Sequence, residues 1–371
     1  MTLQQFQVRK DDLSTTRLVE GPVPDPADGE VLARVDRFAM TANNVTYAVV
    51  GERIGYWAFF QPLDNDDGGW GIVPAWGFAE VVRSRMPDVP EGTRLYGYFP
   101  MATHLVMRPT RVSDTRLVDG SAHRQVLPPV YNGYARLEAA SDQTVGDDER
   151  ALLQPLYFTS FCLHDFFADN DWFGARQLVV VGASSKTAIG VAYALAADED
   201  APRAVAVTSG RNGDMVRALD VYDAVLSYDA LDAVDNTVPT AIIDMSGSGP
   251  VLSELHAHLG DQMRYCANVG VTHWSENEMG PDFIRERSAM FFAPGHIQKR
   301  AAEIGAGEFD RRADEFWRAA AQKSRSWLTI EAVQGLADMP RLFETLRTGG
   351  VPPHRGLAVH LDGERAPSGP V

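Results

Sequence analysis

A glycine and several small polar side chains stand together at residues 182–190, where the chain reads GASSKTAIG. They follow the β-branched run LVVV at 178–181 and lead into an alanine-rich apolar stretch, which predicts a buried strand, a tight turn and a helix. A glycine at such a turn lets the backbone approach a phosphate, and the N–H groups at the helix N-terminus bind the anion. The residues that we expect to contact a phosphate here are Gly182, Ser184, Ser185, Lys186 and Thr187.

Two known phosphate-binding motifs share features with this turn. The dinucleotide fingerprint G-x-G-x-x-G has only its first glycine, Gly182, in register, and hydroxyl side chains replace some of the donors of a glycine-rich loop. The P-loop G-x-x-x-x-G-K-[ST] matches at Lys186-Thr187, but Val180 and Ser185 stand where its glycines are required. The turn therefore favours a dinucleotide. A P-loop kinase is a weak alternative, and a strand–helix turn without a ligand is a third interpretation.

The loop after the next buried strand bears on which dinucleotide binds. It reads VTSGRNG at residues 207–213. Folds specific for NAD place an acid near this position to bind the ribose 2′-OH, and this loop has none. Thr208, Ser209 and Arg211 are present instead, and an arginine binds a 2′-phosphate through charge-assisted hydrogen bonds. The two loops together favour NADP(H) as the cofactor.

The elements that position these residues follow two patterns along the chain. The first third holds short β-branched or aromatic runs separated by Gly, Pro and Asp, which predict a β-rich domain. Its turn-rich segment 61–77 is expected to be a surface loop. From about residue 147, helical stretches alternate with buried strands, which predicts a parallel sheet covered on both faces. The sequence therefore predicts an α/β protein.

Composition limits the classes of function. The 371 residues suffice for two domains, and the formal net charge of −16 argues against a broad surface for nucleic acid or an anionic membrane. The only cysteines are Cys162 and Cys266, which excludes a disulfide framework. The polar N-terminus and the absence of a long apolar run predict neither a signal peptide nor a membrane span, so we expect a cytoplasmic protein.

Segments in a characteristic order resemble the medium-chain dehydrogenase/reductase superfamily, and most closely its zinc-free quinone oxidoreductase and enoyl reductase branches. These segments are 29–51, 76–97, 101–109, 152–167, 178–196, 204–229, 241–260 and 340–361. The resemblance implies a GroES-like, β-rich catalytic domain at 1–140 and 326–371 and a doubly wound Rossmann domain at 141–325, with the nicotinamide in a cleft. It also implies a homodimer.

The resemblance carries over to individual residues as well. It implies that the segment 29–51 is the first strand followed by a substrate-side loop, with hydrogen-bond donors facing the nicotinamide and the substrate at Asn43, Thr46 and Tyr47. Tyr47 is the first choice because its hydroxyl could stabilise an oxygen on which negative charge develops. The further cofactor contacts that it implies are Thr159, Tyr228, Ser246, Gly247, Val269 and Gly270.

Zinc-dependent members of the superfamily need a catalytic site of Cys, His and an acid. Residues 1–161 contain no cysteine, and His104 and His123 cannot form such a site alone. His256 and His258 form an H-x-H pattern, but side chains two apart on a helix point in different directions. We therefore predict no metal site.

The resulting hypothesis is a zinc-independent, NADP(H)-dependent oxidoreductase that transfers hydride to an activated C=C, a carbonyl or a quinone. Its partner would be a small-molecule substrate, with neither nucleic acid nor membrane. The degenerate turn at 182–190 motivates an alternative, a catalytically inactive NADP(H)-binding relative that acts as a sensor or scaffold.

Overall fold

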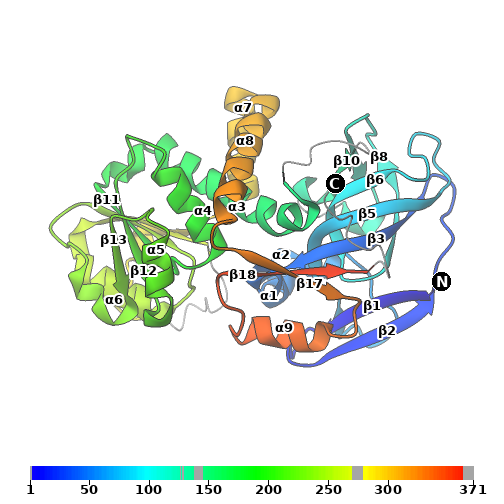
Figure 1. Cartoon of the computed structure of the whole chain (residues 1–371), viewed down its shortest axis with the longest axis horizontal. Helices are drawn as coiled ribbons and strands as arrows, with labels where there is room; N and C mark the ends of the chain where they lie inside the picture. Colours follow the sequence, from blue (N-terminus) through cyan, green and yellow to red (C-terminus); the bar gives the residue numbers. More distant parts are fainter. Residues whose placement is uncertain (1, 126, 128, 138–144, 270–278, 362–371) are drawn as a thin grey trace. The chain divides into compact units, whose positions relative to one another are not determined.

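The computed structural model describes residues 2–125, 127, 129–137, 145–269 and 279–361. The chain divides into two compact units, one formed by Met1–Leu152 with Leu328–Val371 and the other by Leu153–Trp327 (Figure 1). Both ends of the chain therefore belong to the first, β-rich unit, while the second unit is one continuous segment.

Antiparallel pairing dominates the β-rich unit. Its strands are β1 (Thr2–Arg9), β2 (Thr16–Pro22), β3 (Val31–Met40), β4 (Trp70–Gly71), β5 (Pro74–Ser84), β6 (Arg94–Pro100), β7 (His104–Met107), β8 (Pro109–Thr110), β9 (Arg116–Asp119), β10 (Gly133–Leu137), β17 (Thr329–Gln334) and β18 (Arg355–His360). The larger sheet has the order β17-β18-β3-β5-β6-β10-β9-β8, with β7 also paired to β3, and the smaller has the order β2-β1-β4. Strand β18, near the C-terminus, pairs antiparallel with β3, near the N-terminus, so that Leu357 lies opposite Met40.

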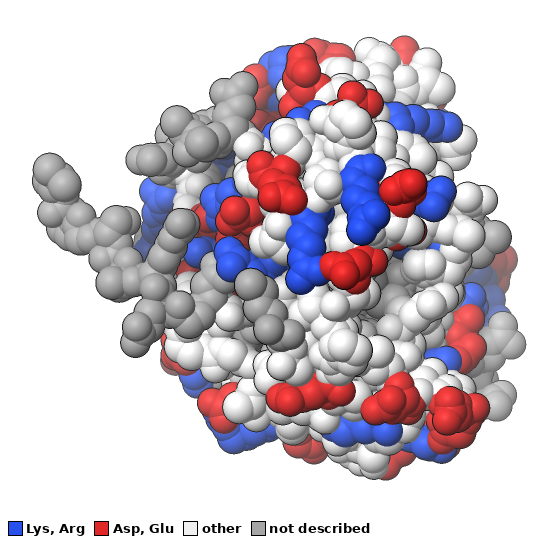
Figure 2. Space-filling model, turned by 90° about the vertical axis from the view of Figure 1, so that its right-hand side faces the viewer, with Lys and Arg blue, Asp and Glu red and all other residues white. Residues whose placement is uncertain are grey.

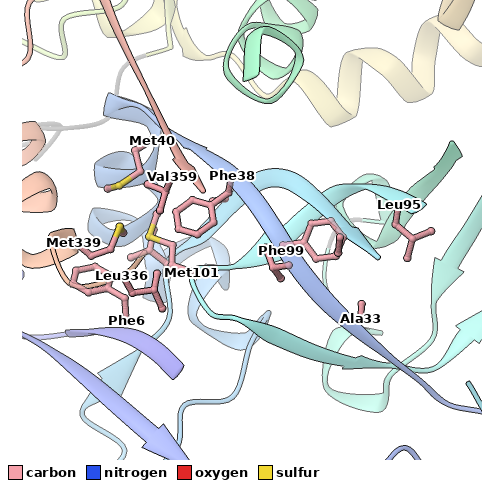
Figure 3. Packing of buried hydrophobic residues seen from close by; sticks show 14 of the residues in the cluster. Phe6, Ala33, Phe38, Met40, Leu95, Phe99, Met101, Leu336, Met339 and Val359 are labelled. Carbon is pink, nitrogen blue, oxygen red and sulfur yellow. The ribbon is translucent and has the colours of Figure 1, made fainter. Parts of the chain in front are cut away.

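Short helices complete this unit. They are α1 (Ala42–Val49), α2 (Gly51–Ile54), α9 (Met339–Arg347) and the 3₁₀ turns η1 (Tyr56–Ala58), η2 (Ala122–Arg124) and η3 (Pro129–Asn132). The core joins both ends of the chain, because Phe6, Phe38 and Phe99 pack in one cluster with Met339 and Val359 (Figure 3). All five side chains are fully buried.

The continuous unit is built on a parallel sheet. Its strands are β11 (Gln177–Val181), β12 (Arg203–Thr208), β13 (Ala224–Ser227), β14 (Thr240–Asp244), β15 (Met263–Asn268) and β16 (Ser288–Met290). They lie in the order β13-β12-β11-β14-β15-β16, and every neighbouring pair is parallel. Numbered along the chain, this order is 3-2-1-4-5-6, which is the Rossmann order with its switch point between β11 and β14. The predicted α/β class is confirmed.

The helices described in this unit are α3 (Asp147–Asp169), which begins in the β-rich unit, α4 (Lys186–Leu195), α5 (Gly213–Ala218), α6 (Gly249–Leu259), α7 (Ala293–Ile304), α8 (Ala306–Ser324) and the 3₁₀ turns η4 (Asp171–Gly174), η5 (Gly210–Asn212), η6 (Tyr228–Ala233), η7 (Gly260–Gln262) and η9 (Arg285–Arg287). Helices α3, α4 and α6 of this unit pack apolar residues against the strands. Contacts to α3 hold the last two helices. Nε2 of His296 in α7 lies 2.7 Å from Oδ2 of Asp165, and Phe309 in α8 packs against Phe161 with ring centroids 5.3 Å apart.

Two expectations from the sequence differ from the structure. The segment 61–77 is not wholly a surface loop, because Ile72, Val73 and Ala75 are buried and β5 begins at Pro74. The segment after β3 is helical at α1 where the resemblance implied a loop, because the Thr41 side chain caps Asn43 N–H and Asn44 Oδ1 caps Thr41 N–H at 2.7 Å.

Charge is distributed evenly on the part of the surface in view. On the face drawn in Figure 2, acidic and basic side chains of the described residues are interspersed. The net charge of −16 is therefore not gathered into a single acidic patch on that face. Among the described helices, none combines the length and the hydropathy that crossing a membrane requires.

Candidate cofactor and substrate sites

Gly182 begins the turn that follows β11. Its φ of +75° lies in the left-handed region, which disfavours any residue with a Cβ. A Cβ added here would also lie 3.1 Å from the backbone nitrogen of Ser246 and 3.3 Å from the carbonyl carbon of Met245. Both features require glycine, so the turn places bare backbone at the carboxyl end of β11, next to the segment that follows β14.

The hydroxyl groups of the turn already take part in its structure. Ser185 is the N-cap of α4, and its Oγ accepts a hydrogen bond from Ala188 N–H at 3.2 Å. Ser184 Oγ accepts from Nδ2 of Asn212 at 3.0 Å, which ties the turn to η5. Both hydroxyls use an acceptor lone pair in these contacts and keep their proton for donation to a ligand. Thr187 is half-buried in the first turn of α4, where its backbone carbonyl accepts from Ser160 Oγ at 2.8 Å.

Lys186 is the first residue of α4, and burial lowers the pKa of its ammonium group to about 8. A cation at the N-terminus of a helix is unfavourable beside the positive end of the helix dipole, and a bound anion would offset this cost.

Gly190 allows α4 to approach α3 closely. A Cβ at this position would lie 2.4 Å from Ser160 Oγ and 2.5 Å from Cδ1 of Tyr157, both on α3. The last glycine of the dinucleotide fingerprint serves close packing of a helix on a strand, whereas Gly190 lies beyond the fingerprint and brings two helices together.

Two buried hydroxyls lie at the end of β12. Thr208 Oγ1 and Ser209 Oγ have no hydrogen-bond partner among the described residues, and the Thr208 side chain is 1% exposed. Arg211 follows in η5, is exposed and forms no ion pair with any described residue. The structure thus brings the predicted Thr208, Ser209 and Arg211 to the carboxyl end of one strand, where the first two have unused hydrogen-bonding capacity.

A buried carboxylate organises the segment after β14. Asp244 accepts hydrogen bonds from Ser246 N–H at 2.8 Å, from Ser246 Oγ at 2.7 Å and from Gly247 N–H at 3.0 Å. Burial is the largest effect on its carboxyl group and raises its pKa to about 6. The polar groups predicted for cofactor contact at Ser246 and Gly247 are therefore turned toward Asp244. Asp244 was not predicted from the sequence, although an acid at the end of the buried strand in IIDMSG indicates such a residue.

The other predicted contacts in this unit have separate surroundings. Tyr228 begins η6, and burial, followed by the charge of Asp244, raises its pKa. Thr159 lies in α3 and donates its hydroxyl to the Pro155 carbonyl at 3.0 Å. Val269 follows β15, and its N–H donates to the backbone carbonyl of Asp244 at 2.8 Å. Gly270 lies outside the described residues.

The structure places the three predicted donors of the β-rich unit on α1. The Tyr47 hydroxyl lies beside Asn43, one turn earlier on the same helix face, and beside Trp76. Burial dominates its titration and raises the pKa of the phenol. Thr46 is not part of this arrangement, because its hydroxyl donates to the Ala42 carbonyl at 3.4 Å. Asn43 and Tyr47 therefore form a pair, and Thr46 does not join them.

The histidines considered as metal ligands have other partners. His104 Nδ1 lies 3.0 Å from Thr103 Oγ1, and His123 Nε2 lies 3.2 Å from the Phe59 carbonyl. His256 Nδ1 accepts from Ile284 N–H at 2.9 Å, and burial lowers its pKa to about 4. Within the described part of the chain, no three His, Cys, Asp or Glu side chains gather in a metal-binding arrangement. Zinc independence remains a prediction.

Several solved structures share the fold of this chain. CurA from Vibrio vulnificus in complex with NADPH superimposes with a TM-score of 0.62 at 14% identity, covering 97% of this chain and 100% of that one. CurK enoyl reductase superimposes with a TM-score of 0.61 at 12% identity, covering 96% of this chain and 99% of that one. A putative NADPH:quinone reductase from Bacillus thuringiensis superimposes with a TM-score of 0.58 at 12% identity, covering 98% of this chain and 100% of that one. No curated protein matches the chain in sequence.

The two units therefore define the medium-chain dehydrogenase/reductase fold, with a GroES-like β-rich unit and a Rossmann unit, and the predicted resemblance is confirmed. The family model described as "Protein of unknown function (DUF2855)" matches residues 38–352, and the chain belongs to this family.

Proposed function

We propose that the protein is an NADP(H)-dependent oxidoreductase whose Rossmann unit binds the cofactor. The observation that carries this proposal is the pair of buried hydroxyls at the end of β12, Thr208 and Ser209, which have no partner among the described residues. A buried polar group left without a hydrogen bond costs about 1–3 kcal/mol. In a sheet of this order, the adenosine ribose of a dinucleotide lies at the end of the second strand, so a ribose phosphate would satisfy both groups.

The charges at this edge of the sheet agree with a phosphorylated ribose. Arg211 is exposed and unpaired among the described residues, and no acid lies between 207 and 213 to bind a ribose 2′-OH. The pyrophosphate would lie at Gly182, where a side chain would strain the turn, and at the N-terminus of α4 with Lys186. The names of neighbours with the same fold, two of which include NADPH, point in the same direction.

The substrate class follows from the donors of the β-rich unit. When bound, NADPH supplies a hydride to carbon, and a proton from a donor or from water completes the reduction. Addition of hydride to an enone, a carbonyl or a quinone leaves negative charge on oxygen, and a donor aimed at that oxygen stabilises it. Tyr47 is the proposed donor, because a phenol is protonated at neutral pH and its hydroxyl lies beside Asn43 on α1.

Calorimetric titration with NADPH, NADH and ATP tests the cofactor. We expect NADPH to bind most tightly, and Arg211→Ala to weaken NADPH tenfold or more with little change for NADH, since a charge-assisted hydrogen bond contributes about 1.5–3 kcal/mol. Arg217→Ala is the matched control, because Arg217 is a nearby exposed arginine that pairs with Asp214 at 2.7 Å. A protein that binds no nucleotide would overturn the proposal. NADPH binding without turnover of quinones, enones or enoyl thioesters would favour the inactive relative.

A further inference from the structure

Ser184 occupies the position in the cofactor turn where the dinucleotide fingerprint has its second glycine. Counting G-x-G-x-x-G from Gly182 places that glycine at residue 184, and its usual role is to let the backbone approach the pyrophosphate. The serine at this point is half-buried and adds a hydroxyl to the turn. The direction of that hydroxyl therefore decides how the turn meets a phosphate.

Asn212 fixes the Ser184 hydroxyl from the neighbouring loop. Its Nδ2 donates to Ser184 Oγ at 3.0 Å, across a separation of 28 residues. A hydroxyl has one proton and two acceptor lone pairs, and the amide of Asn212 occupies a lone pair. No described residue accepts the Ser184 proton, so the contact holds the oxygen in place and leaves the proton for a ligand.

Other bonds already hold the loops at this edge of the sheet together. Gly182 N–H donates to the Val207 carbonyl near the end of β12 at 2.9 Å. The Tyr222 hydroxyl, in the segment after α5, donates to the Ala188 carbonyl of α4 at 3.1 Å. Because the turn and α4 are joined in this way to β12 and to the segment after α5, attachment of the loops alone does not explain the bond from Asn212.

The helix that follows Asn212 does not use its side chain either. Asn212 is the N-cap of α5, a position where an asparagine commonly accepts a hydrogen bond from a backbone N–H of the first turn. Its side chain makes no such bond here. The bond to Ser184 is therefore the one hydrogen bond of this side chain within the described part of the chain.

We infer that Asn212 is a positioning residue of the cofactor site, which directs the Ser184 proton toward the pyrophosphate of the dinucleotide. This inference rests on the proposed function and deepens it. The amide that donates to the serine oxygen also polarises the hydroxyl, which strengthens the bond that the hydroxyl gives. NADPH and NADH share the pyrophosphate, so Asn212 acts on both cofactors, whereas the adjacent Arg211 acts on the 2′-phosphate alone.

A double-mutant cycle of Ser184 and Asn212, with calorimetric titration of NADPH and NADH, tests the inference. We expect Ser184→Ala to weaken the binding of both cofactors about tenfold, the loss of one hydrogen bond to a charged group. Asn212→Ala should weaken both by a smaller factor, about threefold, because the hydroxyl remains but is no longer oriented. In the Ser184→Ala background, Asn212→Ala should have no further effect on either affinity.

An asparagine that only supports the fold would weaken binding whether or not the serine hydroxyl is present. Equal effects of Asn212→Ala in the parent and in Ser184→Ala would therefore overturn the inference. Unchanged affinities in Asn212→Ala, or a loss confined to NADPH, would overturn it as well. Asn236→Ala is the matched control, because Asn236 donates to the His258 carbonyl and precedes β14, at the opposite edge of the sheet, so both affinities should stay unchanged.

The same titrations separate the inference from the proposed function. If the parent binds NADPH but the effects of the two substitutions simply add, only the inference fails. If the parent binds NADH as tightly as NADPH and the effects do not add, the preference for NADP(H) fails and the inference stands. A parent that binds neither dinucleotide overturns both.

Discussion

Replacing Gly182 with alanine tests the geometry of the cofactor turn. A residue with a Cβ in the left-handed region costs about 1–2 kcal/mol. The new methyl group would also press on the backbone of Met245 and Ser246 at 3.1–3.3 Å, and backbone yields less easily than the end of a flexible side chain. We therefore expect Gly182→Ala to lower the free energy of unfolding by about 2 kcal/mol and to weaken NADPH binding, since the turn and the segment after β14 must separate.

The matched control for this experiment is Gly210→Ala. Gly210 follows β12 at the same edge of the sheet, but its φ is not in the left-handed region and a Cβ there would meet nothing within 4 Å. Alanine at such a position should be neutral or slightly stabilising. Urea denaturation followed by circular dichroism compares the two variants, and titration with NADPH follows the binding. Equal stability and equal NADPH affinity of the two variants would refute this account of the turn.

Two further predictions concern pH. Because the folded protein holds the proton of Asp244 more tightly than the unfolded chain does, with a pKa of about 6 against 3.8, the free energy of unfolding should fall by about 3 kcal/mol as the pH rises between these values. Urea denaturation at a series of pH values measures this dependence, and Asp244→Asn should remove it. The same fall in the free energy of unfolding with pH in both proteins would contradict the raised pKa of Asp244. Lys186 has a pKa lowered to about 8, and a bound phosphate favours its charged form, so NADPH affinity should be constant below pH 8 and decline above it. In Lys186→Met the affinity for NADPH should be weaker and should not change with pH around pH 8. If calorimetry finds that the NADPH affinity of the parent protein is also independent of pH, Lys186 does not contact the phosphate.

Much of the Rossmann unit could be predicted from the sequence because its signals are local. Strands buried on both faces are continuous apolar runs, as at 178–181, and Gly182 marks the point where the chain must turn sharply. The missing acid after β12 is likewise visible in the sequence.

The β-rich unit was harder to predict because long-range contacts decide its details. The buried half of the segment 61–77 follows from pairing of β5 with β3 and β6, which no local pattern specifies. Arg124 stands in the polar stretch SAHRQ, and nothing nearby indicates that its guanidinium is buried among aromatic rings.

The pairing of β18 with β3 has a consequence for synthesis of the chain. During synthesis, β17, β18 and α9 are made only after the whole Rossmann segment. The core around Phe6, Phe38 and Phe99 therefore remains incomplete until Met339 and Val359 have been added. The Rossmann segment, by contrast, is continuous and contains every strand of its own sheet. On the ribosome, the unit that begins the chain would therefore be the last to finish folding, and its unfinished core and the unpaired edge of β3 would be open to chaperones throughout that interval.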